Sequence, residues 1–143
     1  MVISIEYTEG EFVFKLLLSL GAGFLVGMER ESRGKKAGIS TQTFVIAGAM
    51  LFTMMSLMID PNEPARVAAQ IVTGIGFLGA GIILKDKTGN ITNLTTAASI
   101  WFSAAIGMTI GIGYYMIAIL ATLFSILVPR IPHFFGSPDH HDK

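Results

Sequence analysis

Long apolar stretches, separated by short polar segments, dominate the pattern of residues along the chain. Three of them cover residues 12–28, 43–59 and 67–84. A fourth, residues 94–128, holds 35 residues without one Asp, Glu, Lys or Arg. At about 1.5 Å per residue, a single helix of that length would far exceed the roughly 30 Å core of a bilayer. The pattern therefore predicts two antiparallel helices in this run, separated near Gly111.

Composition supports a membrane protein. Of the 143 residues, 52% are hydrophobic and 14% are charged, and the mean hydropathy is +0.63. Such values are typical of chains that cross a bilayer several times. We therefore expect an all-α membrane protein with five transmembrane helices. Its transmembrane domain is predicted at residues 12–130, between an N-terminal tail at residues 1–11 and a cytoplasmic tail at residues 131–143.

The basic residues are distributed unevenly between the two sides of the predicted membrane. If the first loop lies inside, eight of them are on the inner side: Arg30, Arg33, Lys35, Lys36, Lys85, Lys87, Arg130 and Lys143. The outer side then holds Lys15 and Arg66. Because Lys and Arg accumulate in cytoplasmic loops, we predict the N-terminus outside and the C-terminus inside. Lys15, one turn into the first helix, is expected to extend outward to the membrane surface.

Glycines at helix-packing spacing indicate where the helices should touch. In a bilayer a glycine-rich segment still forms a helix, because its backbone must satisfy its own hydrogen bonds, and small residues then let helices approach closely. The run at residues 67–84 is rich in glycine, and it is predicted as the central helix on which the others pack. The predicted packing positions, within the bundle or between protomers, are Gly23, Gly27, Gly74, Gly76, Gly79, Gly81 and Gly107.

The densest polar segment, residues 27–38, follows the first apolar run. Glu29 comes directly after apolar residues, so it should lie at the membrane interface, where an ionised carboxylate needs a partner. Arg30, Arg33 or a helix N-terminus on the inner side could supply that partner. Two interpretations stay open: an architectural ion pair, and a site for a cation or a protein partner. In the second, Glu29 is the best candidate for a metal ligand.

Other polar residues occur at helix entries and along one helix face. Thr92 or Asn93 is expected to cap the fourth helix, and Thr96 and Ser99 to form hydrogen bonds across helices. Arg66, Gln70 and Thr73 form a polar stripe on the third predicted helix. These residues could line a water-filled path or tie helices together, and we favour the second role.

Several function classes are not supported. The chain has no Cys and a formal net charge of zero, which excludes thiol chemistry and gives no support for nucleic-acid binding. No catalytic motif is present, and no acidic residue falls at the middle of a predicted helix, as a proton relay would require. We expect neither an enzyme nor a cleaved signal peptide.

Three sequence blocks resemble the MgtC/SapB/YhiD membrane family, and they follow the family's order between residues 16 and 128. The first is Gly27-Met-Glu-Arg-Glu31 with Gly34, Ala37 and Gly38. The second is Ala65-Arg-Val-Ala-Ala-Gln-Ile-Val-Thr-Gly-Ile-Gly-Phe-Leu-Gly-Ala-Gly-Ile82. The third is Leu94-Thr-Thr-Ala-Ala-Ser-Ile-Trp101 with Ala104-Ala-Ile-Gly107. The matching polar positions are Glu29, Arg30, Arg66, Gln70 and Thr96.

The resemblance implies a multi-pass protein of the bacterial inner membrane, linked to growth in low magnesium and, in pathogens, to survival inside host cells. It also implies action on other membrane proteins, including the F-type ATP synthase and a magnesium-transporting P-type ATPase. We therefore expect a modulator of membrane proteins that forms homo-oligomers in the lipid bilayer. The alternative is a magnesium transporter or channel, and a third hypothesis is a scaffold without ion dependence. No cofactor is expected, with Mg²⁺ as the candidate ion.

Two features depart from the family pattern. Ser40, Thr41 and Gln42 stand where the family usually has Arg, Thr, and then His or Asn, so one cationic position is missing. Longer members also carry a soluble C-terminal domain with an ACT-like fold. This chain stops shortly after the fifth predicted helix, so regulation through such a domain is not expected.

Overall fold

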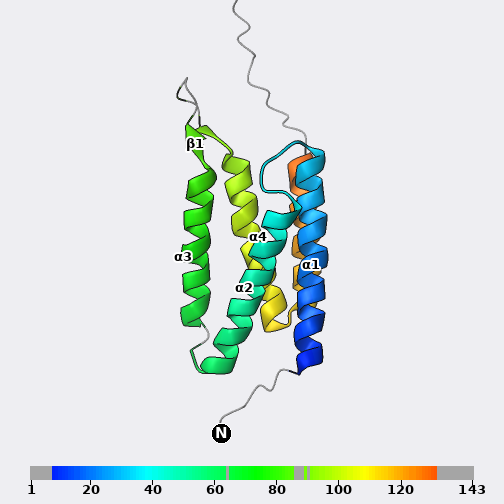
Figure 1. The fold of residues 1–143 in the computed structure, drawn as a ribbon, viewed down its shortest axis with the longest axis vertical. Helices are drawn as coiled ribbons and strands as arrows, with labels where there is room; N and C mark the ends of the chain where they lie inside the picture. The colour runs from blue at the N-terminus through cyan, green and yellow to red at the C-terminus, as the bar shows by residue number, and fades with distance from the viewer. Residues whose placement is uncertain (1–7, 64, 86–88, 90, 132–143) are drawn as a thin grey trace, which may run out of the picture.

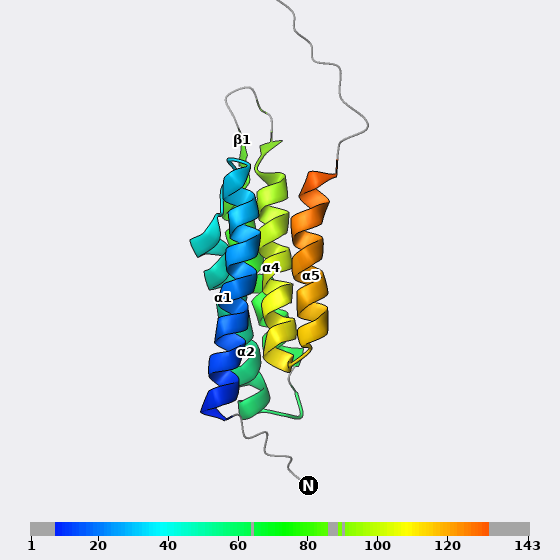
Figure 2. The ribbon, with the colours of Figure 1, turned by 90° about the vertical axis from the view of Figure 1, so that its right-hand side faces the viewer.

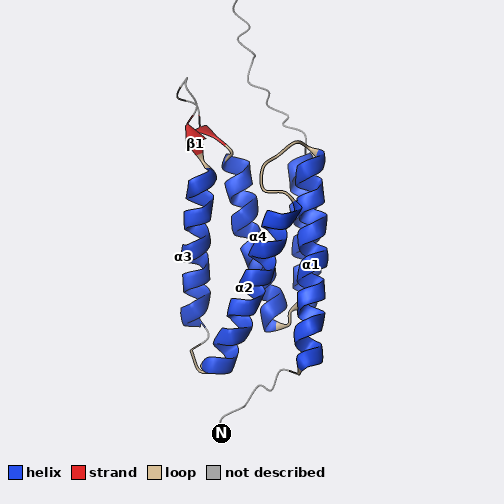
Figure 3. Ribbon diagram, in the orientation of Figure 1, coloured by secondary structure: helices blue, strands red, loops and turns tan. Residues whose placement is uncertain are grey.

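The chain forms a bundle of helices that run alternately up and down (Figure 1). The computed structural model describes residues 8–63, 65–85, 89 and 91–131. The described helices are α1 (Glu9–Ser32), α2 (Ile39–Ile59), α3 (Ala65–Ile82), α4 (Leu94–Ile112) and α5 (Tyr115–Leu127), followed by the 3₁₀ turn η1 (Val128–Arg130). Two short strands, β1 (Leu84–Lys85) and β2 (Ile91–Thr92), pair antiparallel between α3 and α4 (Figure 3).

The all-α membrane class is confirmed for the described part of the chain. Four helices there, α1 to α4, are long and apolar enough to cross a membrane, and α5 with η1 is a shorter apolar segment. Large apolar side chains point outward from the bundle; Phe44 is 79% exposed and Phe77 is 78% exposed. In water such a surface would promote aggregation, whereas a bilayer covers it.

The helix α1 begins at Glu9, before the predicted start of the first apolar run. The side chain of Thr8 explains this start, because its Oγ1 accepts a hydrogen bond from the backbone N–H of Glu11 at 3.2 Å. Glu9 and Glu11 also lie in the first turn, where the helix dipole favours negative charge.

Gly113 separates α4 from α5, two residues after the predicted break. Its φ of +98° places it in the left-handed region, which glycine adopts without steric cost. The N–H of Tyr114 donates to the carbonyl of Thr109 at 2.8 Å, and the N–H of Gly113 donates to that of Ile110 at 3.0 Å. These two bonds form a Schellman motif, which ends α4 and lets α5 turn back.

The central helix of the bundle is α2, with α1 and α4 packed on either side of it. Figure 2 shows α5 alongside α4. The main core contains fully buried apolar side chains from α2 and α4: Ile46, Met50, Ile106 and Ile110. The prediction that residues 67–84 form the central helix is wrong. Of the 18 residues in α3, Ile75 and Gly79 alone are buried, and α3 packs mainly against α4.

The predicted packing glycines separate into two groups. Gly23, Gly27 and Gly107 lie where α2 approaches closely, and a Cβ atom there would collide with backbone atoms of Thr43, Ile39 and Ile46 respectively. The α3 glycines are different. Gly79 would make only an ordinary contact with Ala97, and a Cβ at any of three others would meet nothing within 4 Å: Gly74, Gly76 and Gly81. Within one chain, the glycine face of α3 is therefore largely unpacked.

Candidate functional site

Buried polar side chains gather at the end of the bundle where α1 ends and where α2 and α4 begin, the upper end in Figure 1. We call this group the polar cluster. Its members are Glu29, Arg30, Gln42, Thr96, Ser99 and Ser103, of which all except the half-buried Ser99 are buried. Since buried polar groups are costly unless they are hydrogen-bonded, their contacts define what the cluster can do.

Arg30 connects three segments of the chain. It is only 2% exposed, and its Nη2 donates to Oγ1 of Thr96 on α4 and to the carbonyl of Lys36 at 3.3 Å. Its Nε is buried without a hydrogen-bond partner among the described residues. Arg30 thus holds the end of α1, the loop before α2 and the first turn of α4 together.

Gln42 continues the hydrogen-bond network toward the middle of the bundle. Its Nε2 donates at 3.2 Å both to the carbonyl of Ala37 and to Oγ of Ser99. Its Oε1 accepts from Oγ of Ser103 at 2.6 Å, and Oγ of Ser99 donates to the carbonyl of Thr96 at 2.9 Å. The network therefore extends from Arg30 to Ser103 along the interface of α2 and α4.

Glu29 pairs with Arg33, one of the predicted partners. Nη1 of Arg33 lies 3.3 Å from Oε1 of Glu29, whose side chain is 3% exposed, against 38% for Arg33. The same Nη1 also donates to the carbonyl of Pro129 in η1. The ion pair therefore links the end of α1 to the segment that follows α5.

Metal ligands do not gather in the described part of the chain. No three His, Asp or Glu side chains lie close enough there to hold an ion. Glu31, the acid nearest to Glu29 in the sequence, uses its Oε1 to accept the backbone N–H of Ile39 at 2.9 Å, at the start of α2. A hard cation takes six or more oxygen ligands, and Glu29 alone supplies too few.

The other predicted site residues lie apart from the polar cluster. Arg66 and Gln70 are exposed near the start of α3, at the opposite end of the bundle. Asn93 is half-buried, and its Nδ2 donates to the carbonyl of Ile82 at 3.2 Å. Asn93 occupies the N-cap position of α4, as one of the two predicted candidates, but its side chain makes no capping bond. It joins the end of α3 to the start of α4 instead.

Sequence reasoning missed the roles of Gln42, Ser103 and Lys15. Gln42 was identified only as a departure from the family pattern, although a Gln within an apolar helix is itself a sign of a buried partner. The expectation that Lys15 reaches outward is wrong. Its side chain is fully buried, and Nζ donates to the carbonyl of Gly111 at 2.9 Å and lies 2.9 Å from Oε1 of Glu11. A cation there is stabilised by the free carbonyls at the end of α4.

An apolar layer separates these two polar regions. Along α2, Ile46 and Met50 follow Gln42, and along α4, Ile106 and Ile110 follow Ser103. All four apolar side chains are fully buried. Within one chain the polar cluster therefore ends near the middle of the bundle.

These features define the class: a helical-bundle membrane protein with a hydrogen-bonded polar cluster buried at one end. The chain belongs to the MgtC family, whose family model matches residues 16–135. It is 44% identical over 132 residues to the Escherichia coli (strain K12) protein named "Putative magnesium transporter YhiD", covering 86% of this chain and 61% of that protein.

Two relatives named MgtC are also similar. The Salmonella typhimurium (strain LT2) protein is 43% identical over 112 residues, covering 78% of this chain and 48% of that protein. The Brucella abortus (strain 2308) protein is 49% identical over 107 residues, covering 74% of this chain and 44% of that protein. The chain thus spans about half the length of these relatives. No solved structure matches it.

Proposed function

We propose that this chain acts in magnesium-related homeostasis or stress adaptation by binding and modulating another membrane protein of the bacterial inner membrane. The printed name of the Escherichia coli (strain K12) relative, "Putative magnesium transporter YhiD", supports the link to magnesium. The resemblance described above adds two candidate partners, an F-type ATP synthase and a P-type ATPase. The observation that carries the proposal is the outward face of α3.

That outward face bears small residues three or four positions apart. We call it the small-residue stripe; it consists of Ala69, Thr73, Gly76 and Ala80, all exposed. Oγ1 of Thr73 donates to the carbonyl of Ala69 at 3.0 Å, so this hydroxyl is already satisfied, and a Cβ at Gly76 would meet nothing. In a membrane, small residues let a neighbouring helix pack closely. The stripe therefore suits a helix of a second copy or of another membrane protein.

The interior of the chain supports a modulator more than a carrier. The apolar layer of Ile46, Met50, Ile106 and Ile110 lies between the polar cluster and the buried Lys15. A transport path through one chain would have to open this layer.

A magnesium transporter is the second candidate function, and one observation favours it. Arg66, Gln70 and Thr73 are exposed on α3, so they could line a path between copies in an oligomer. Magnesium flux into liposomes that contain only this protein would support the transporter, whereas well-folded protein without flux would support the modulator.

The same proposal includes five transmembrane segments with the C-terminus inside. In the described part of the chain, several basic residues lie at the end of the bundle that bears the polar cluster: Arg30, Arg33, Lys35, Lys36 and Arg130. The positive-inside rule assigns that end to the cytoplasm. The basic group of a partner protein would then compete with Arg33 for Glu29.

Growth in low magnesium tests this role of Glu29. We expect Glu29→Gln to abolish rescue of a deletion strain while the protein still inserts at normal levels, because the substitution removes the buried charge but keeps the shape. Glu9→Gln, on an exposed residue of the same helix, is the matched control and should rescue fully. Full rescue by Glu29→Gln would contradict the proposal.

A further inference from the structure

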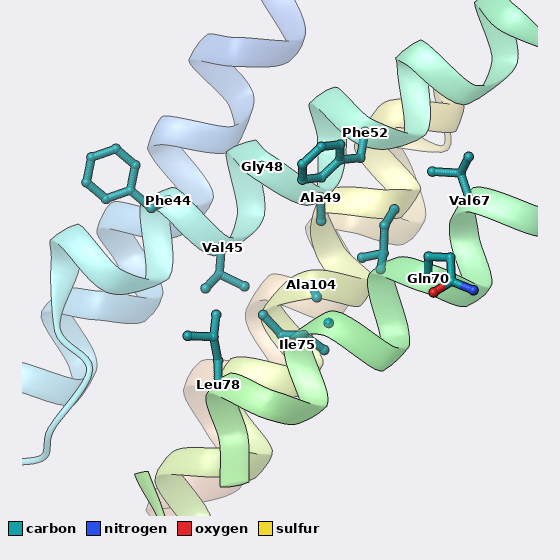
Figure 4. A pocket seen from close by; sticks show the side chains of 12 residues that line it. Phe44, Val45, Gly48, Ala49, Phe52, Val67, Gln70, Ile75, Leu78 and Ala104 are labelled. Carbon is teal, nitrogen blue, oxygen red and sulfur yellow. The ribbon is translucent and has the colours of Figure 1, made fainter. Parts of the chain in front are cut away.

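An apolar groove of about 520 Å³ lies between α2 and α3. Figure 4 shows side chains from both helices facing it, including Val45 and Phe52 from α2 and Val67 and Leu78 from α3. Gln70 is its one polar lining residue. Its volume lies within the range of small-molecule sites, which are mostly apolar with few polar groups.

The length of the groove matches one leaflet of a bilayer. Along α3 its lining runs from Val67 to Leu78, which at 1.5 Å per residue is about 16 Å. Half of a bilayer core is roughly 15 Å thick. The groove therefore has the depth that one acyl chain occupies when its headgroup lies at the Val67 end.

That end of the groove opens on a charged pocket of about 190 Å³. The two cavities share Phe52 and Val67 as lining residues. Asp60, Glu63 and Arg66 also line the pocket. The carboxylate of Asp60 is held in place, because its Oδ1 accepts the backbone N–H groups of Asn62 at 3.1 Å and Glu63 at 3.3 Å.

We infer that this groove binds a phospholipid with a zwitterionic ethanolamine headgroup. One acyl chain lies between α2 and α3, the phosphate faces Arg66, and the ammonium faces Glu63 and Asp60. Two carboxylates beside one guanidinium disfavour a headgroup with net negative charge, and a primary ammonium is a good donor to carboxylates. The site is distinct from the small-residue stripe, which lies on the outward face of α3.

Native mass spectrometry of the purified full chain tests this inference. The protein is offered phosphatidylethanolamine and phosphatidylglycerol, which differ in the headgroup and carry identical acyl chains. They are called the ethanolamine lipid and the glycerol lipid below. We expect one retained ethanolamine lipid per chain, with an affinity roughly tenfold higher than for the glycerol lipid. Gly74→Leu should lower this affinity by about tenfold or more, because the new side chain occupies space that the acyl chain would fill and displaces apolar contacts.

Two further variants make the test specific. Gly81→Leu is the matched control, since position 81 is also open but lies outside both the groove and the small-residue stripe, and it should bind lipid like the wild type. Glu63→Lys, at an exposed residue, should reverse the preference toward the anionic glycerol lipid.

Three results would overturn the inference. One is equal or weaker retention of the ethanolamine lipid by the wild type. Another is equal loss of lipid in Gly74→Leu and Gly81→Leu, which would indicate nonspecific binding. The third is an altered oligomeric state in Gly74→Leu with lipid binding unchanged, which would assign the groove to a second copy of the chain.

Discussion

Arg30 places a guanidinium where an apolar bundle would ordinarily hold none. Its hydrogen bonds to Thr96 and to the carbonyl of Lys36 replace those that water would make, and such charge-assisted bonds are stronger than neutral ones. Removing the guanidinium takes a donor away from Oγ1 of the buried Thr96 and breaks the link between the three segments. The cost of losing Arg30 should therefore appear as a loss of stability.

We predict that Arg30→Gln lowers the free energy of unfolding by about 1–3 kcal/mol, the usual cost of leaving buried polar groups unsatisfied. Lys35→Gln is the control, since Lys35 is exposed nearby, and it should change stability by less than about 0.5 kcal/mol. Unfolding in detergent can be followed by the fluorescence of the single Trp, Trp101. Equal stability of the two variants would show that Arg30 does not hold the segments together.

At the scale of the helices, close approach to α2 determines the arrangement. Gly107 lies against the carbonyl of Ile46, and Gly23 and Gly27 lie against the first turns of α2. A glycine has no side chain to separate two backbones, so dispersion contacts extend along the whole interface. The glycines of α3 have no such partner within the chain.

We predict that an alanine substitution destabilises the protein much more at a packed glycine of α4 than at an open glycine of α3. Gly107→Ala should destabilise the bundle by about 1–3 kcal/mol, because the new methyl group meets backbone that cannot move aside cheaply. Gly74→Ala, at an open position, should stay within about 1 kcal/mol of the wild type. Thermal unfolding of both variants in the same detergent measures the difference. A similar loss of stability in both variants would mean that the glycine face of α3 is packed against another helix in the detergent-solubilised protein.

Hydropathy predicted the positions of the helices along the chain well, but not which helices pack against one another. Charge-free runs of bilayer length must be helical, so the segments now seen as α1 to α4 were predictable, and the break near Gly111 was misplaced by only two residues. Packing was harder to predict, because in this chain glycines lie both at close helix contacts and at open positions. The segment richest in glycine, α3, lies at the edge of the bundle. Hydropathy also does not say which way a side chain points. Lys15 was placed correctly along its helix, but its side chain points inward rather than outward.

The whole molecule has one strongly basic end, and the polar cluster lies there. If that end is cytoplasmic, the loop between α2 and α3 lies on the outer side of the membrane. The absence of Cys from the sequence makes this measurable. We predict that Asn62→Cys, at an exposed loop position, reacts with a membrane-impermeant maleimide in intact cells. Lys36→Cys, also exposed, should react only after permeabilisation. The reverse pattern would invert the orientation.

The small-residue stripe decides how the molecule meets its neighbours. We predict that Ala80→Leu weakens homo-oligomers, because the larger side chain holds apart helices that pack through small residues. Single-molecule counting of labelled protein in liposomes measures the oligomeric state. Gly74→Leu, on the groove side of the same helix, should leave it unchanged.

Growth in low magnesium then identifies what uses the stripe. Ala80→Leu should lose both the oligomer and the rescue if self-association is needed for function. If it loses rescue while the oligomeric state stays the same, the stripe contacts another membrane protein, and self-association must occur elsewhere. A variant that keeps both would show that neither copies nor partners pack on this face of α3, and the proposed modulator would then lack its docking surface.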